Sequence, residues 1–431
     1  MVILGINAYH ADASAAIFVD GKLVAAIEEE RFRRVKHWAG FPQQAIEFCL
    51  QEAGIGFKEV DHWAIGRDPK AKFFKKLLYL ANNPSVGFTA IKDRFNNSRK
   101  VAGINTELAR ISGLPANLFS GKVHNVEHHR SHIASAFFAS PFNEAACLSI
   151  DGSGDFSTTM TGVGKGNEIS ILQSVDFPHS IGIFYTAFTQ LLGFPYYGDE
   201  YKVMGMAPYG QPAYVEALAK MVTLTNEGLF KLNLEYFRTG SSGIISYAAD
   251  NTPVVATLFS DKMIEVFGKP RKKDEPLTQF HKNLAASVQS ITEKIIFHLL
   301  INLQKQTGLT NVCIAGGVAQ NSVANGKILS NTPFKNIYIP SAGHDAGISM
   351  GAALYTQHHV LKFPRQAEIK SAYTGSHFNN AEIKKILIEK QIAFIELPDG
   401  ELFEQVTDCL INGGVAGWFC GRAEFGPRAL G

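Results

Sequence analysis

Residues 148–173 read LSIDGSGDFSTTMTGVGKGNEISILQ, and this stretch decides the fold. An apolar strand ends at Asp151, a turn rich in glycine and serine follows, and two further strands flank a glycine-rich hairpin. The N-terminus repeats this order with three apolar strands, over residues 2–9, 14–19 and 22–28. Placing LGIN on LSID aligns Asn7 with Asp151. The sequence therefore predicts an internally duplicated three-stranded unit.

Such a duplication is typical of the actin, Hsp70 and sugar-kinase folds, in which two ribonuclease-H-like halves hold nucleotide phosphates between their first turns. Two unrelated meanders would give the same pattern, and this alternative stays open. Residues 278–307 carry an apolar residue at every third or fourth position, with Gly308 as the C-cap, which predicts a long helix. A strand at 311–315 follows and runs into a Gly-Gly turn that can approach a nucleotide. We expect an α/β fold.

Composition sets limits on the class of protein. The chain has 431 residues, of which 46% are hydrophobic and 19% charged, with a net charge of +2. This size allows two or three domains, and the charge balance favours neither nucleic acid nor an anionic membrane as a partner. His10, Asp12 and Asp20 interrupt the apolar N-terminus, so we expect no signal peptide, no membrane span and a cytoplasmic location. The five cysteines form no CxxC pair, which predicts reduced thiols.

Residues 69–100 mix lysines with aromatic and aliphatic residues at near-helical spacing. A basic lid over an anionic substrate is one interpretation. A surface helix with a solvated lysine face is the one that we favour, because long lysine side chains usually keep their charge in water.

Two histidines stand four residues apart in EHHRSH, residues 127–132. On a helix, His128 and His132 project from one face and can bind one cation, although ordinary histidines on a partly exposed turn would show the same spacing. Asp151 ends a strand and Asp345 lies in a glycine-flanked turn, both typical places for a ligand-binding carboxylate. Two histidines and two aspartates suit ferrous iron, manganese or zinc, with coordination positions left for a substrate oxygen. Such a cation would act as a Lewis acid.

Ordered motifs along the whole chain carry a family resemblance. They are LGINAYHADASAAIFVDG, EEERFRRVKH, HHRSHIASAFFASPF, IDGSGDF, FPHSIGIFYTAFTQLLGF, GDEYKVMGMAPYG, AGGVAQNSVANGKI and GRAEFGPRALG. With these motifs the chain resembles the NodU/CmcH-type O-carbamoyltransferases, a family that includes the enzyme that carbamoylates tobramycin. The resemblance implies an actin/Hsp70-like domain over residues 1–365, similar to the tRNA threonylcarbamoyl transferases, with its second half beginning near residue 145. It also implies the beginning of a YrdC-like α/β domain over 366–431, which we expect to be incomplete after Gly431.

The activity that the resemblance implies has two steps. The YrdC-like module makes carbamoyl-adenylate from carbamoyl phosphate and ATP, which enters as its magnesium complex. The N-terminal domain then passes the carbamoyl group to a hydroxyl of a sugar or other natural product, as in antibiotic or secondary-metabolite biosynthesis. The expected partners are therefore ATP, carbamoyl phosphate and a hydroxylated small-molecule acceptor. A homodimer, or a separate adenylating subunit, is the protein partner that this scheme leaves open.

Two other functions remain as alternatives. One is a truncated relative that binds nucleotide or serves as a scaffold and needs a separate activating module. The other is an actin-like ATPase or phosphotransferase, in which Asp151 would hold magnesium through water. The histidine pair argues against the latter, since magnesium avoids imidazole.

The resemblance also assigns roles to individual residues. The metal ligands are His128, His132, Asp151 and Asp345, and the metal in the family is usually iron. His10 matches an essential histidine that could act as general base, and Lys36 could neutralise the adenylate phosphate. The residues expected to bind nucleotide are Gly152, Gly154, Glu200, Lys202, Gly316, Gly317 and Asn321. The residues expected to bind carbamoyl phosphate are Arg422 and Arg428. We expect the acceptor to contact residues near His10, the 69–100 segment and the aromatic run 177–197.

Overall fold

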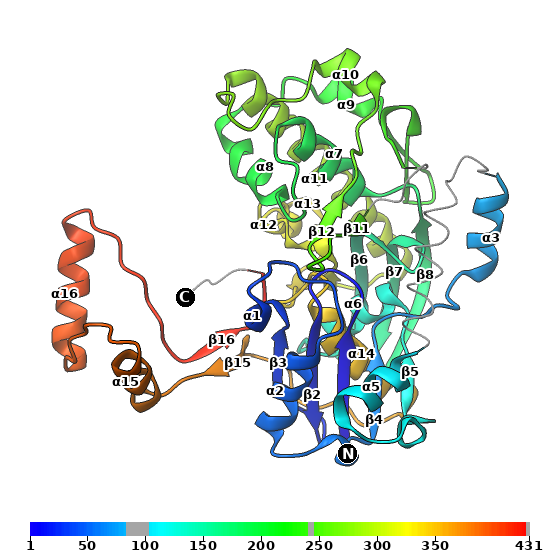
Figure 1. Ribbon diagram of the computed structural model, residues 1–431. Coiled ribbons are helices and arrows are strands. Elements are labelled where there is room, and N and C mark those ends of the chain that lie inside the picture. Colours follow the sequence, from blue (N-terminus) through cyan, green and yellow to red (C-terminus); the bar gives the residue numbers. More distant parts are fainter. Residues whose placement is uncertain (83–102, 240–244, 428–431) are drawn as a thin grey trace.

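The computed structural model describes residues 1–82, 103–239 and 245–427, which form two five-stranded sheets and their helices (Figure 1). The first sheet has the order β3-β2-β1-β4-β5 and the second the order β8-β7-β6-β13-β14. In each sheet the first three strands form an antiparallel meander, and two later strands add parallel to its first strand. The predicted duplication and the α/β class are therefore confirmed.

The strands of the first sheet are β1 Val2–Asn7, β2 Ser14–Val19, β3 Lys22–Glu28, β4 His62–Ile65 and β5 Val123–Asn125. Those of the second are β6 Glu144–Gly154, β7 Ser157–Lys165, β8 Glu168–Asp176, β13 Asn311–Ala315 and β14 Asn336–Tyr338. Both meanders turn through residues with a left-handed backbone, Asp20 and Gly21 in the first and Gly166 in the second.

Alternation of side chains along the strands sorts the core into layers. In β1, Leu4 and Ile6 pack on the outer face of the first sheet with α2 Gln43–Ala53, whereas Ile3 points to the opposite face. That opposite face packs against a central helix, α14 Gly347–Leu354. Helix α14 packs in turn against α6 His128–Phe137, and α6 contacts the inner face of the second sheet. The centre of the protein is thus a helical layer between two sheets.

The outer face of the second sheet carries a larger helical lobe, in the upper part of Figure 1. Its long helix α11 Gln279–Thr307 begins after the cap residue Thr278 and ends at Gly308, whose φ is 69°, so the predicted helix is confirmed. It is the helix among the described residues that is long and apolar enough to cross a membrane, and 67% of its most apolar window is buried inside the protein. The other elements of the lobe are α7 Ile181–Leu191, α8 Glu200–Met206, α9 Val215–Ala219, α10 Asp261–Phe267, α12 Ser322–Asn325, α13 Ile328–Asn331 and the hairpins β9 Val222–Leu224 with β10 Phe230–Leu232 and β11 Ile245–Tyr247 with β12 Pro253–Val255.

The described part of the 69–100 segment is a surface helix, as the sequence favours. This part contains α3 Phe73–Asn82, while residues 83–100 lie outside the described residues. Two lysines at the start of this part, Lys72 and Lys75, pair with Asp176 of β8. The Lys75 side chain is itself 59% exposed, and it shares the exposed surface with Phe73, Phe74, Leu77 and Leu78, all more than half exposed. The expected surface helix is therefore confirmed for α3, but its exposed face is apolar as well as basic.

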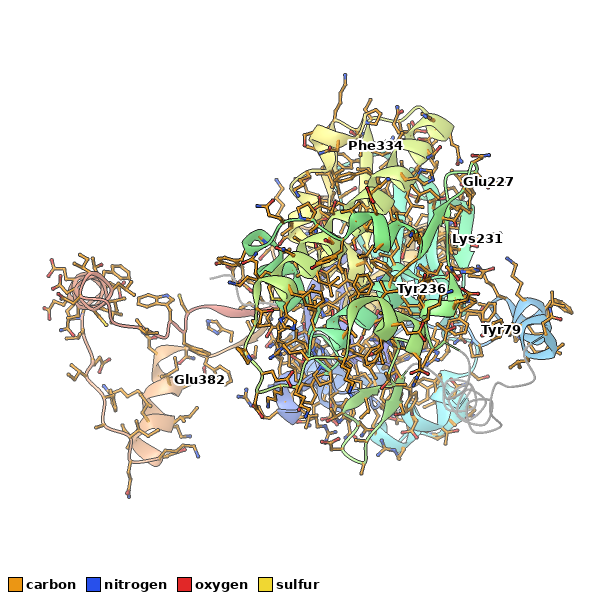
Figure 2. The ribbon with its side chains drawn as sticks, turned by 90° about the horizontal axis from the view of Figure 1, so that it is seen from above. Tyr79, Glu227, Lys231, Tyr236, Phe334 and Glu382 are labelled. Carbon is orange, nitrogen blue, oxygen red and sulfur yellow. The ribbon has the colours of Figure 1, made fainter. Side chains whose placement is uncertain are left out.

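The C-terminal residues form an arm that projects from the body on the side opposite to α3, as Figures 1 and 2 show. Strands β15 Tyr373–His377 and β16 Arg422–Glu424 pair with each other, and the Thr374 hydroxyl donates to the carbonyl of Ala26 in β3. Helices α15 Asn380–Glu389 and α16 Asp399–Ile411 have no buried residue. The YrdC-like assignment of 366–431, and the boundary at 365, stay predictions.

Candidate metal and transfer site

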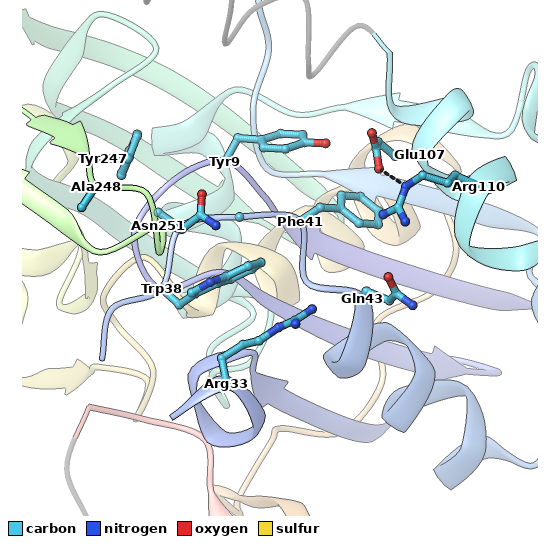
Figure 3. Close-up of a pocket in the computed structure, with 12 residues that line it drawn as sticks. Tyr9, Arg33, Trp38, Phe41, Gln43, Glu107, Arg110, Tyr247, Ala248 and Asn251 are labelled. Carbon is cyan, nitrogen blue, oxygen red and sulfur yellow. Dashed lines mark hydrogen bonds and ion pairs between the residues drawn. The ribbon is translucent and has the colours of Figure 1, made fainter. Parts of the chain in front are cut away.

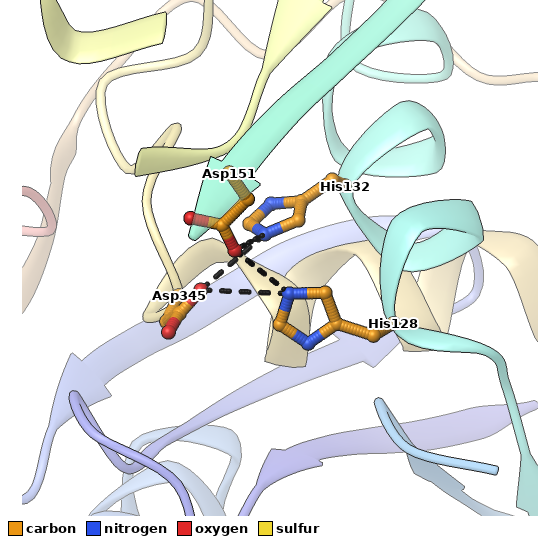
Figure 4. A group of neighbouring side chains, drawn as sticks. All are labelled: His128, His132, Asp151 and Asp345. Carbon is orange, nitrogen blue, oxygen red and sulfur yellow. Dashed lines mark hydrogen bonds and ion pairs between the residues drawn. The ribbon is translucent and has the colours of Figure 1, made fainter. Parts of the chain in front are cut away.

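The helix α6 presents two imidazoles to the ends of other elements. The Glu127 carboxylate caps this helix by accepting from the N–H of Arg130 at 2.8 Å. Because His128 and His132 are one turn apart, both rings face the end of β6 and the turn before α14. Figure 4 shows them meeting Asp151 and Asp345 there. All four side chains are buried.

The spacing of the four side chains fits a cation. From Nε2 of His128, the distances are 2.9 Å to Oδ2 of Asp151 and 3.7 Å to Oδ1 of Asp345. Nε2 of His132 lies 3.4 Å from Oδ2 of Asp151 and also 3.4 Å from Oδ1 of Asp345. Ligand atoms about 2.1 Å from a tetrahedral metal lie roughly 3.4 Å apart, which matches these separations. His132 Nε2 and Asp345 Oδ1 are buried with no hydrogen-bond partner among the described residues, so a cation would satisfy them. The residues fit the iron, manganese or zinc expected from the sequence.

The electrostatics of the cluster favour ionised carboxylates. Burial opposes ionisation of Asp151, but the hydrogen bond with His128 and the nearby imidazole of His132 outweigh it and hold the pKa of Asp151 well below its usual range. Burial and the charge of Asp151 both oppose ionisation of Asp345, yet its pKa is also low because His10 and His132 lie beside it. Burial lowers the pKa of His132, but the two carboxylates raise it to about 9. The protein alone thus balances part of this negative charge with a proton on His132, which a bound metal would displace.

Two glycines make room for the cluster. A Cβ at Gly154 would lie 2.0 Å from Cγ of the His128 ring. The N–H of Gly317 donates to Oδ1 of Asp151 at 3.1 Å, and a Cβ there would lie 2.8 Å from the same oxygen. The neighbouring His129 has its Nδ1 2.7 Å from the Ser149 hydroxyl. These contacts orient Asp151 and leave space for His128.

His10 lies at the edge of the cluster. Its Nδ1 is 2.8 Å from Oδ2 of Asp345, and its ring centroid is 5.4 Å from that of His128. Burial lowers the pKa of His10, but the Asp345 carboxylate outweighs burial and raises it above its ordinary value. The Asn7 amide, at the end of β1, donates to backbone carbonyls on both sides of the site, including that of Asp345. The two halves of the duplication therefore meet here.

Sequence reasoning did not single out a second polar pair beside the site. Nδ1 of His37 lies 2.7 Å from Oδ1 of Asp12, and the N–H of His37 donates to Glu30 at 2.7 Å. Both Asp12 and His37 have a positive φ, 57° and 58°, so the chain holds this pair in an uncommon backbone conformation. Lys36, its exposed neighbour, lies over the Tyr201 ring at 5.9 Å. No sequence pattern predicts the pairing, because it joins two separate turns.

The residues expected to bind nucleotide fall into two groups. Gly152, Gly154, Gly316 and Gly317 come together beside Asp151, where β6 and β13 end. The other three have polar partners within the protein. Glu200 accepts from Thr186 at 2.6 Å, Lys202 pairs with Asp199 at 2.6 Å, and the Asn321 amide bonds with that of Gln289 at 2.9 Å. Their nucleotide roles stay predictions.

The carbamoyl phosphate residues lie away from the metal cluster or outside the described chain. Arg422 donates to the carbonyls of Thr374 and Gly375 and pairs with Glu52 of α2 at 2.8 Å. Its guanidinium thus joins the arm to the body. Arg428 lies outside the described residues. The exposed side chain of Arg33 pairs with buried Glu29 at 2.9 Å.

Comparison with known proteins places this geometry in context. A family model described as "Carbamoyltransferase N-terminus" matches residues 2–354. An uncharacterized protein of Synechocystis is 42% identical over 447 residues, covering 100% of this chain and 70% of its own length. The nodulation protein NolNO of Sinorhizobium fredii is 32% identical over 434 residues, which cover 99% of this chain and 58% of NolNO. The nodulation protein NolO of Bradyrhizobium diazoefficiens is 35% identical over 308 residues, which cover 71% of this chain and 52% of NolO. The chain therefore spans between 52% and 70% of the length of these relatives.

Among solved structures, HypF of T. kodakarensis is similar over 84% of this chain and 48% of the HypF chain. The sequence identity is 13% and the TM-score is 0.39. A ROK hexokinase from Thermus thermophilus is similar over 84% of this chain and 100% of the hexokinase chain. The sequence identity is 15% and the TM-score is 0.37.

Proposed function

The chain belongs to the carbamoyltransferase family, and from this membership we propose that it transfers a carbamoyl group from carbamoyl-adenylate to a hydroxyl of a small-molecule acceptor. The observation that supports this reaction is the buried cluster of two histidines and two aspartates, with His10 at its edge. The donor would come from ATP and carbamoyl phosphate, through a C-terminal module or a separate adenylating subunit.

The four clustered residues would hold the cation. His128 and His132 would each give Nε2, and Asp151 and Asp345 one carboxylate oxygen each. A bound divalent cation supplies Lewis acidity that stabilises negative charge on the carbamoyl oxygen. Burial of the four side chains keeps water from competing for these positions.

His10 would accept the proton of the acceptor hydroxyl. Its Nδ1 faces the Asp345 carboxylate at 2.8 Å, which favours a proton on Nδ1 and leaves Nε2 as the accepting atom. As the hydroxyl oxygen bonds to the carbamoyl carbon, the bond from that carbon to the phosphate oxygen breaks, and the adenylate leaves with the electron pair. The hydroxyl proton moves to Nε2 of His10, so charge and atoms balance.

The test supplies the activated donor directly. Purified chain loaded with iron, manganese or zinc is incubated with isotope-labelled carbamoyl-adenylate and a panel of hydroxylated acceptors, and labelled carbamoyl ester is measured by mass spectrometry. We expect labelled product from the wild type and a loss of roughly 100-fold or more in His10→Asn. Arg34→Gln, at the exposed end of α1 Glu30–Arg33, serves as the control that keeps the activity.

Two results would count against the proposal. The first is metal-loaded chain that binds carbamoyl-adenylate without passing its label to any acceptor, which would favour the nucleotide-binding or scaffold alternative. The second is release of inorganic phosphate from ATP at a rate that His10→Asn leaves unchanged, which would favour an ATPase.

A further inference from the structure

Two turns of the N-terminal half bring together a second group of candidate metal ligands. A carboxylate oxygen of Asp12, a carboxylate oxygen of Glu30 and a ring nitrogen of His37 all lie within 4.8 Å of one another. Asp12 is buried, and the other two side chains are partly buried, so solvent can still reach the group. It shares no residue with the four-residue cluster of His128, His132, Asp151 and Asp345.

The backbone holds the two turns against each other. The N–H of Ala13 donates to the carbonyl of Trp38 at 3.0 Å, which places the residues before them, Asp12 and His37, side by side. Both have a left-handed backbone, with φ of 57° and 58°. This conformation costs free energy in residues other than glycine, and residues that adopt it concentrate at ligand-binding and active sites.

The His37 ring is fixed with Nδ1 toward the carboxylates. Nδ1 lies 2.7 Å from Oδ1 of Asp12, and the Tyr197 ring packs edge-on at a centroid distance of 5.0 Å. Gly198 makes room on the other side, because a Cβ there would lie 2.5 Å from Nε2. Nε2 is buried without a hydrogen-bond partner among the described residues. The ring can therefore carry its proton on Nε2 and leave Nδ1 free to coordinate.

The charges of the group favour a cation. Burial opposes ionisation of Asp12, but the charge of His37 and its hydrogen bond outweigh burial and lower the pKa of Asp12. One oxygen of Glu30 accepts from the N–H of His37 at 2.7 Å. The other lies 3.5 Å from the guanidinium of Arg31, which is shared with Glu28 at 3.3 Å. With His37 neutral, the carboxylates thus outnumber the single guanidinium beside them.

The group adjoins the four-residue cluster through one side chain. The Asn7 amide donates to the backbone carbonyl of Asp12 at 3.0 Å and to that of Asp345 at 3.1 Å. The turns that carry a ligand of each group are therefore held by the same carboxamide.

The nearby cavity is a different feature. Arg33 and Trp38 line a cavity of about 530 Å³, together with Glu107 and Arg110 of α5 Ile104–Ser112, which pair at 2.9 Å (Figure 3). The lining includes none of the three candidate ligands. An ion bound by these ligands would therefore not depend on what the cavity holds.

We propose that Asp12, Glu30 and His37 form a second site for a divalent transition-metal ion, manganese or zinc. Each carboxylate would give one oxygen and His37 would give Nδ1, a mixed set of donors that suits these ions. Donor atoms about 2.1 Å from one ion lie roughly 3.0 to 4.2 Å apart, so even the farthest pair would close by at most about 0.6 Å. The ion would displace the proton shared by His37 and Asp12, and water or an anionic oxygen would fill its remaining positions.

The test counts bound ions, so its result does not depend on carbamoyl transfer. Chain stripped of metal with a chelator is dialysed against Mn²⁺ or Zn²⁺, and ions per chain are measured by plasma mass spectrometry. The variants are Asp12→Asn, Glu30→Gln and His128→Ala. Asparagine tolerates the left-handed backbone of position 12. The matched control is Asp20→Asn, at an exposed aspartate whose φ is also positive, 48°.

We expect two ions per chain in the wild type and in Asp20→Asn. Asp12→Asn and Glu30→Gln should each lose one ion, with its affinity reduced by roughly 100-fold or more, because each removes a charged ligand. His128→Ala should keep the ion that these two variants lose. Circular dichroism shows which variants fold, and either Asp12→Asn or Glu30→Gln alone is sufficient for the comparison.

Two results would overturn the proposal. One is a wild type with a single ion that His128→Ala loses and that Asp12→Asn and Glu30→Gln retain, which would make the group a hydrogen-bonded contact between turns. The other is a wild type that binds no ion. A single ion lost in Asp12→Asn and Glu30→Gln but kept in His128→Ala would support the second site and count against the four-residue cluster alone.

Discussion

Replacing Gly154 by alanine should disable the metal cluster without touching a ligand. The new Cβ would lie 2.0 Å from Cγ of the His128 ring, whereas ordinary contacts begin at 3.4 Å. The imidazole would have to retreat by about 1.4 Å, the difference between these two distances. Metal–ligand distances tolerate shifts of about 0.2 Å, so His128 could no longer coordinate with the other three residues.

The expected loss is at least as large as that from disturbing a residue that orients a ligand, roughly 10- to 100-fold in metal affinity. The matched control is Gly152→Ala, two residues earlier in the same strand, where a Cβ would meet nothing within 4 Å. Affinity for zinc is measured by competition with a chromophoric chelator, and for iron by plasma mass spectrometry after anaerobic dialysis. Circular dichroism and thermal melting confirm that both variants fold.

Equal metal affinity in Gly154→Ala and Gly152→Ala would refute the reasoning, since it would mean that the cluster does not depend on the position of His128. A folded wild type that takes up no iron, manganese or zinc would refute the metal site itself.

Three further predictions concern proton binding, transfer and thiol exposure. Burial raises the pKa of Glu28 from 4.5 to about 7, so the folded state prefers the protonated form. The resulting stabilisation of about 3 kcal/mol is present below pH 4.5 and is lost as pH rises through 7. The free energy of unfolding, measured with urea, should therefore fall over this pH range in the wild type and fall less in Glu28→Gln. His10→Asn should lower the rate of carbamoyl transfer while leaving metal stoichiometry unchanged, since His10 contacts the ligand Asp345 and not the cation; loss of metal would show a structural role instead. Iodoacetamide should modify the exposed Cys409 and Cys420 first, as mass spectrometry of peptides would show, with slow labelling of the three buried thiols, Cys49, Cys147 and Cys313.

Local sequence patterns were sufficient to predict the helices and strands and the duplication of the three-stranded unit. Period-two alternation and the left-handed turn at Asp20-Gly21 predict the meander, and apolar spacing with a glycine cap predicts α11, because these features depend on neighbouring residues alone. The spacing of His128 and His132 likewise places both imidazoles on one helix face. These parts of the fold and of the site follow from the sequence.

Other parts depend on how the elements pack. Asp345 reaches the two histidines because α14 and α6 pack together between the sheets, and the pairing of His37 with Asp12 joins two turns that no periodicity connects. Packing between elements also buries Glu29, with which Arg33 pairs, and places the aromatic residues of α7 in the core. Helix and strand periodicities assign a residue to a face of its own element. Which faces meet is decided by the packing of the two sheets around the central helices, so only the tertiary structure brings the four residues of the cluster together.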